Sequence, residues 1–123
     1  MNANPATRYQ RGSHRERQVR DLLREQGWEV FRCAGSKPCD LVALRCNGRF
    51  TSGPDFGMPS SAEVRLIEVK AGDHGGPFEN FRPADRQALS QAAQRAGAEA
   101  WLVWWPPRRE PQWIAEPDWP GAS

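Results

Sequence analysis

Two short apolar runs, each joined to charged residues, constrain the fold of this chain more than any other feature. The first run, residues 41–44, directly follows Asp40, and the second, residues 64–70, contains Glu68 and ends at Lys70. Glu68 and Lys70 are two positions apart, so a β-strand would place both side chains on the same face of a sheet. If the two runs form neighbouring strands, the carboxylates of Asp40 and Glu68 converge. The pattern therefore predicts a sheet that presents two carboxylates and a lysine together.

Two converging carboxylates supply the hard oxygen ligands that a divalent cation needs to activate water and to carry the charge of an attacked phosphate. A solvated ion pair would explain Glu68 and Lys70 alone. Lysine usage favours the catalytic interpretation, because Lys37 and Lys70 are the only lysines among 17 basic residues and both fall in the proposed site. Lysine offers a compact charge with an adjustable pKa, which arginine does not. We therefore expect a metal-dependent phosphodiesterase site.

Asp55 also precedes Glu68 and is the alternative acidic partner. Its neighbours, residues 52–60, have the glycine and proline content of a loop and no strand pattern. A metal ligand must be held rigidly, which favours an aspartate that adjoins an ordered element. Asp40 is therefore the predicted ligand.

Glu16 is a third candidate, on a helix that we expect to begin at Ser13 and to stop at Gly27. Ser13 and Glu16 have the spacing of a capping box, in which the two side chains satisfy the first amides of a helix. Glu16 also shares a helical face with Val19 and Leu23, which directs its carboxylate toward the core. Capping and metal binding, either direct or through water, are both open interpretations of Glu16.

The remaining elements follow from apolar periodicity and from glycine and proline positions. We expect further strands at 28–33, 100–105 and 112–115, a second helix at 83–97, and connections at 46–62 and 72–81. The predicted organisation is a flexible arm at 1–10, one domain at 11–115 with a mobile loop insertion at 46–62, and a tail at 116–123. Five tryptophans beyond residue 100 exceed what so small a core can bury, so we predict at least one at an interface.

The net charge of +2 is unevenly distributed along the chain. Residues 1–37 contain eight basic and four acidic residues, a local charge of +4, which leaves −2 for the remainder. A basic segment beside a metal-masked acidic site suits a phosphate backbone, although an ordinary solvated helix face has the same composition. The residues predicted to bind DNA are Arg11, Gly12, Arg15, Arg32, Ser36 and Lys37.

Cys33, Cys39 and Cys46 include no Cys-x-x-Cys pair, which argues against a disulfide framework and against structural zinc. A zinc site completed by His14 or His74 is the less favoured alternative. There is no apolar stretch long enough to span a bilayer and no secretory leader, so we expect a cytoplasmic protein with no membrane partner.

Together these motifs resemble the archaeal-type Holliday junction resolvases of the PD-(D/E)xK nuclease superfamily, over residues 10–105. The resemblance rests on Arg11-Gly12, Glu16, Leu22-Leu23, Gly27, Arg32, Ala34-Gly35-Ser36, Asp40-Leu41-Val42-Ala43 and Ile67-Glu68-Val69-Lys70. It implies a restriction-endonuclease-like α/β fold with a central mixed β-sheet flanked by helices. It also implies a homodimer that depends on magnesium and cleaves four-way DNA junctions symmetrically. Manganese is the expected substitute ion, and we expect a bacterial or phage source.

The resemblance makes Glu16, Asp40, Glu68 and Lys70 catalytic, with Ser36 assisting. Asp40, Glu68 and the Val69 carbonyl would hold magnesium, Glu16 would act directly or through water, and Lys70 would orient the attacking water.

Residues 83–87, which precede an alanine-rich helix, also resemble the glutamine motif of VRR-type nucleases and make Gln87 an accessory candidate. A VRR-type or other PD-(D/E)xK nuclease that acts on branched, flap or duplex DNA is therefore the alternative enzyme. The alternative outside the enzymes is a catalytically silent DNA-binding module of the same fold.

Overall fold

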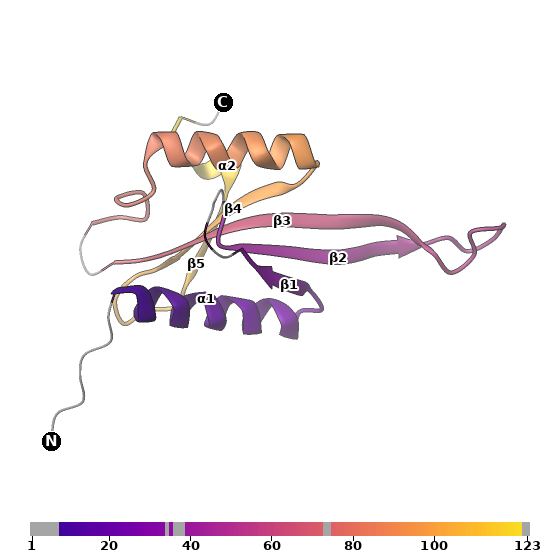
Figure 1. The fold of residues 1–123 in the computed structure, drawn as a ribbon, viewed down its shortest axis with the longest axis horizontal. Coiled ribbons are helices and arrows are strands. Elements are labelled where there is room, and N and C mark those ends of the chain that lie inside the picture. The colour runs from indigo at the N-terminus through magenta and orange to yellow at the C-terminus, as the bar shows by residue number, and fades with distance from the viewer. Residues whose placement is uncertain (1–7, 34, 36–38, 73–74, 122–123) are drawn as a thin grey trace, which may run out of the picture.

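A mixed β-sheet with a helix on each face forms the fold, as predicted (Figure 1). The computed structural model describes residues 8–33, 35, 39–72 and 75–121. Its elements are α1 (Arg8–Glu25), β1 (Glu29–Arg32), β2 (Leu41–Arg49), β3 (Pro59–Ala71), α2 (Pro83–Ala96), β4 (Glu99–Trp105), β5 (Gln112–Ala115) and the 3-10 helix η1 (Glu116–Asp118). The strands lie in the order β1-β2-β3-β4-β5, with β3 and β4 parallel and every other neighbouring pair antiparallel.

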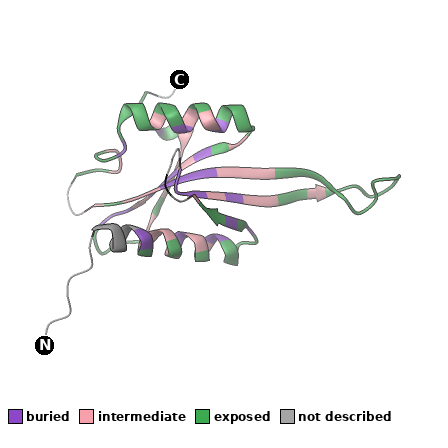
Figure 2. Ribbon diagram, viewed as in Figure 1, coloured by how far each residue is buried: buried purple, intermediate pink, exposed green. Residues whose placement is uncertain are grey.

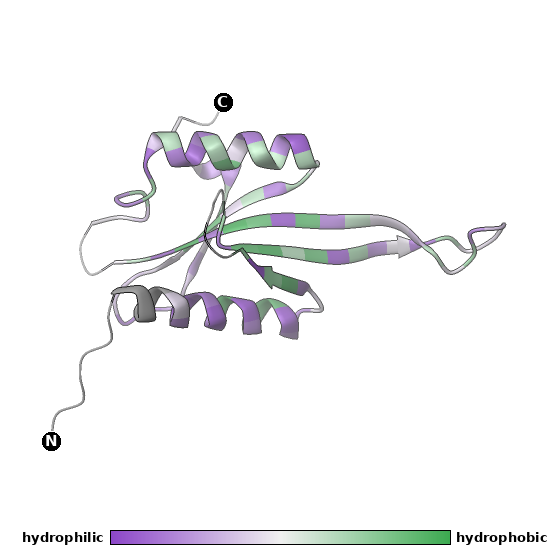
Figure 3. Ribbon diagram, in the orientation of Figure 1, coloured by the Kyte–Doolittle hydropathy of each residue, from purple (hydrophilic) through white to green (hydrophobic). Residues whose placement is uncertain are grey.

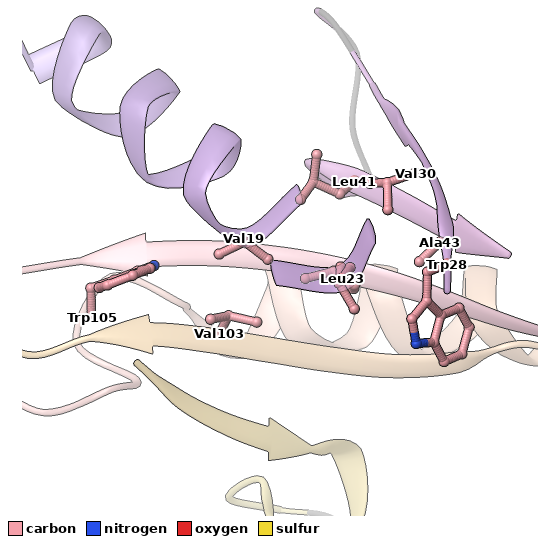
Figure 4. Packing of buried hydrophobic residues seen from close by; sticks show 9 residues of the cluster. Val19, Leu23, Trp28, Val30, Leu41, Ala43, Val103 and Trp105 are labelled. Carbon is pink, nitrogen blue, oxygen red and sulfur yellow. The ribbon is translucent and has the colours of Figure 1, made fainter. Parts of the chain in front are cut away.

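Alternation along the strands sorts the apolar side chains onto two faces of the sheet. The cluster under α1 contains Val19, Leu23, Trp28, Val30, Leu41, Ala43, Ile67, Val103 and Trp105 (Figure 4). The cluster under α2 contains Cys39, Leu66, Phe81, Leu89, Ala93, Ala100, Leu102 and Trp119. The hydrophobic residues accordingly concentrate in the middle of the sheet, while the outer face of α1 is hydrophilic (Figure 3). In the described part of the chain no helix is long and apolar enough to cross a membrane.

The first helix begins at Arg8, earlier than predicted, so residues 8–10 belong to α1 and not to an arm. Ser13 is buried inside this helix, and the predicted capping box is therefore wrong. Residues three apart on a helix share a face, so the spacing of Ser13 and Glu16 places both side chains on one side of α1. The predicted stop is confirmed: Gly27 has φ 91°, and the Trp28 N–H donates back to the Leu23 carbonyl at 3.1 Å.

The β2–β3 hairpin is longer than the apolar pattern indicated. Residues 46–49 and 59–62 are strand, so only residues 50–58 connect the two, and the loop predicted at 46–62 is wrong over half its length. The hairpin projects beyond both helices, and its outer half is exposed (Figure 2). Exposed strand needs no apolar alternation, because backbone pairing maintains it up to the register shifts near Gly48 and beyond them. The sequence pattern therefore disappears where the strands leave the core.

None of the six tryptophans is fully exposed: three are buried and three are half-buried, and a tryptophan at an interface stays a prediction. Trp119, assigned to the tail, lies in the α2-face cluster, where its ring packs edge-on against Phe81 with 5.0 Å between centroids. Trp28 is covered by the guanidinium groups of Arg45 and Arg65, at 4.2 and 4.5 Å from its ring centre. Arginine stacking and the use of both sheet faces thus let a small domain bury more indole than its length suggests.

Replacing Phe81 with alanine should lower the free energy of unfolding by about 3–5 kcal/mol, because Phe81 is fully buried and its removal leaves a cavity beside Trp119. Phe56, which is 71% exposed in the hairpin connection, is the matched control and should change stability by less than about 0.5 kcal/mol. Urea denaturation of both variants measures the difference. Equal losses would contradict the assignment of Phe81 to the core.

Candidate active site

Asp40 lies immediately before β2 and is attached to β3 on both sides of Glu68. The Asp40 N–H donates to the Ile67 carbonyl at 3.0 Å, and the Val69 N–H donates to Oδ2 of Asp40 at 2.9 Å. Both carboxylates are buried, with exposed fractions of 5% for Asp40 and 4% for Glu68. The fold therefore brings the two predicted acidic residues to one place on neighbouring strands.

Lys70 shares a sheet face with Glu68. Leu66 of β3 belongs to the cluster under α2, and Glu68 and Lys70 follow it at successive even positions, so all three side chains face the same way. Lys70 is partly buried and lies opposite Trp104 in the register with β4. A positive charge thus stands one step beyond the buried carboxylates, toward the end of the strand.

The site has the chemistry of a hard-cation site. Buried carboxylates are costly unless hydrogen-bond donors or a cation compensate them, and Val69 supplies one donor to Asp40. Among the described residues, no group of three His, Cys, Asp or Glu side chains forms a ready-made cage. Two carboxylates completed by water and substrate oxygen are the usual coordination of Mg²⁺. The donors from Asp40 and Glu68 therefore fit that ion.

Glu16 does not cap α1, because that helix begins at Arg8. Its Oε2 lies 3.2 Å from Nε of Arg32, and the Glu16 side chain is largely buried while that of Arg32 is 44% exposed. Arg32 ends β1 and is paired in register with Leu41, the residue after Asp40. A predicted catalytic carboxylate and a predicted DNA-binding arginine therefore form one ion pair close to Asp40 in the sheet.

The other predicted DNA-binding residues are only partly placed. Ser36 and Lys37 lie outside the described residues, and the structure describes no side-chain positions at 11 and 12. Arg15 lies on α1, where its guanidinium stacks 4.6 Å from the ring centre of Trp105 and donates to the Gln18 side chain. Sequence reasoning missed this contact, because nothing local links α1 to β4.

Two alternative candidates lie away from the carboxylates. Asp55 is exposed in the 50–58 connection, at the far end of a β2 strand that spans about 30 Å. Gln87 is exposed on α2 and lines a groove of about 370 Å³ together with Arg86, Ser90 and Trp119, among others. The lining of that groove includes none of the predicted catalytic residues.

The cysteines hold an arrangement that their spacing did not reveal. All three are free thiols, as expected, but the sulfurs of Cys33 and Cys39 lie 3.9 Å apart. Burial, reinforced by the neighbouring Cys33, raises the pKa of Cys39 to about 12. Cys46 is exposed on β2, and its thiol donates to the Gly48 carbonyl. In the sequence, Cys33 and Cys39 lie on either side of the connection between two strands. That position was the signal for their contact.

A mixed sheet with a helix on each face, and an acidic residue beside a Glu-x-Lys strand, define the class of restriction-endonuclease-like nucleases. The chain belongs to the archaeal Holliday junction resolvase (Hjc) family, whose model matches residues 7–118. Hjc from Archaeoglobus fulgidus, a Holliday junction resolvase from an archaeal hyperthermophile, has a similar structure, with a TM-score of 0.61. Its identity is 25%, over 86% of this chain and 73% of that chain.

The resemblance found in the sequence is therefore confirmed, and the family supports a junction-resolving nuclease. A search of curated proteins gave no match. The family and the solved homologue are archaeal, and the bacterial or phage source stays a prediction.

Asp40→Ala should lower the free energy of unfolding by about 1–3 kcal/mol, because the Val69 N–H loses its acceptor in a partly buried setting. Asp40→Asn keeps an acceptor oxygen of the same shape and removes one of two buried charges, so its loss should be smaller. Urea denaturation in metal-free buffer compares them. A less stable asparagine variant would show that the Val69 hydrogen bond is not what holds Asp40.

Proposed function

We propose that the protein resolves four-way DNA junctions by magnesium-dependent hydrolysis of the phosphodiester backbone. One observation carries the chemistry: a buried aspartate is hydrogen-bonded to the backbone on both sides of a buried glutamate, with a lysine next on the same strand face. Membership of the resolvase family supports the substrate. We infer that the protein acts in the cytoplasm, where its DNA substrate would be met.

Asp40 and Glu68, with the Val69 carbonyl, would hold the ion. A bound divalent cation supplies Lewis acidity and charge for the attacked phosphate. The Val69 N–H orients the Asp40 carboxylate before the ion arrives, which reduces the rearrangement that binding requires. Lys70 would donate hydrogen bonds to the attacking water and to the phosphate oxygens as negative charge develops on them.

Glu16 would act through water, because its carboxylate is occupied by the Arg32 guanidinium at 3.2 Å. Arg32 is the more exposed partner and can contact a phosphate from that position. The remaining backbone contacts are assigned to Arg11, Gly12, Arg15, Ser36 and Lys37, with Ser36 assisting in catalysis. Phosphate contacts of this kind position a duplex without reading its sequence.

A homodimer would supply the second active site. Resolution requires a cut on each of two opposing strands, and each chain carries a single Asp40–Glu68 pair. Two-fold symmetry would place equivalent sites on a junction that is itself two-fold symmetric.

Asp40→Asn and Glu68→Gln should bind a labelled four-way junction but not cut it, since each variant loses a ligand charge and keeps side-chain size. Lys70→Ala should slow cleavage by about two to four orders of magnitude. Asp55→Asn is the matched control and should cut normally. Gel assays on junction, flap, linear duplex and single strand measure rate and preference. Wild-type cutting by either carboxylate variant would overturn the site, and equal cutting of linear duplex would indicate a general nuclease.

Magnesium or manganese should support cleavage, calcium should support binding with little turnover, and EDTA should stop the reaction, because the donors are hard oxygens. Magnesium should also raise the melting temperature of the wild type, by mass action on the folded state. Glu68→Gln should show a much smaller rise in the same titration. Full activity in EDTA would exclude this mechanism.

A further inference from the structure

Cys33 and Cys39 lie near the two ends of the connection between β1 and β2, and the fold brings those ends side by side. Arg32 and Leu41 are paired in the ladder, and the Cys33 N–H donates to the Asp40 carbonyl at 2.8 Å. The two sulfurs consequently approach to 3.9 Å, although five residues separate the cysteines in the sequence. Neither residue is needed by the site described above.

A disulfide requires sulfurs about 2.05 Å apart, so the two thiols are within a small side-chain and backbone adjustment of bonding. Cys33 is partly exposed, whereas Cys39 is buried with its sulfur 3.9 Å from that of Cys33. Cys46 provides an internal comparison, because it is the most accessible thiol but is engaged with its own strand at Gly48.

We propose that Cys33 and Cys39 are a reversible redox modification site, which a low-molecular-weight disulfide converts into an intramolecular disulfide, and that this modification lowers nuclease activity. The second half of the proposal rests on the proposed function. The first half does not.

The reaction proceeds by two exchanges. The deprotonated Cys33 thiol attacks one sulfur of the small disulfide, expels the other half as a thiolate and forms a mixed disulfide. The Cys39 thiol then attacks the Cys33 sulfur, and the expelled thiolate takes up the Cys39 proton. In total two cysteine thiols lose two protons and two electrons, and the small disulfide is reduced to two thiols. An added dithiol reverses both steps.

The link would reach the active site through one peptide bond. Cys39 directly precedes Asp40, whose N–H and carboxylate are fixed to Ile67 and Val69 of β3. Closing the sulfurs by nearly 2 Å must move Cys33, Cys39 or both, and a shift passed to Asp40 displaces a predicted metal ligand. Misplacement of a reacting group by about 1 Å can reduce a rate by about 100-fold.

Formation of the bond is tested on the full chain with glutathione disulfide as the oxidant. After free thiols are alkylated, a non-reducing peptide map should contain a Cys33–Cys39 cross-linked peptide that is two hydrogens lighter, while Cys46 is alkylated. Cys46→Ser should give the same cross-link, and Cys33→Ser should give none. Alkylation of both Cys33 and Cys39 after oxidation, or glutathione retained on Cys33 without a cross-link, would overturn the proposal.

The functional half is tested by magnesium-dependent junction cleavage before and after oxidation. Oxidised wild type should cut about 10- to 100-fold more slowly and recover with dithiothreitol. Cys33→Ser should be insensitive to the oxidant, and Cys46→Ser should stay sensitive. Cross-linked protein that cuts at the reduced rate would overturn the regulatory role. If the reduced wild type fails to cut junctions, the proposed function is wrong. The peptide map still tests whether the disulfide forms.

Discussion

The attachment of Asp40 to β3 is the interaction on which the rest of the site depends. Its N–H bonds to Ile67 and its carboxylate accepts from Val69, so one residue at the start of β2 is fixed to the strand that carries Glu68 and Lys70. Because both contacts are made to the backbone of β3, they do not rely on any side chain of that strand. The geometry of the acidic pair is therefore built into the sheet.

The two apolar clusters make this burial of charge tolerable. Each face of the sheet has its own helix and its own set of fully buried side chains, including Leu23 under α1 and Leu89 under α2. Apolar burial on both faces stabilises the central strands by far more than one buried carboxylate costs. The carboxylates are largely shielded from solvent between the two clusters, with exposed fractions of 5% and 4%.

Residues just before β2 make several contacts within a short stretch of the chain. Arg32 pairs with Glu16 across from α1, Cys33 and Cys39 touch, and Asp40 joins β3. The residues proposed for substrate contact, thiol chemistry and metal binding therefore lie close together in the fold.

Local signals were sufficient for much of the fold and for the candidate residues. Short apolar runs located the cores of β2 to β4. Pro83 and Gly97 bounded α2, because one fixes φ and the other adopts φ 65° at the cap. The Asp40, Glu68 and Lys70 pattern pointed to one site. Tertiary structure alone decided that Glu16 meets Arg32 and that Arg15 stacks on Trp105. It also decided that tryptophans pack on both faces of the sheet. These contacts depend on which distant segments pair, and periodicity or spacing within one segment carries no information about that pairing.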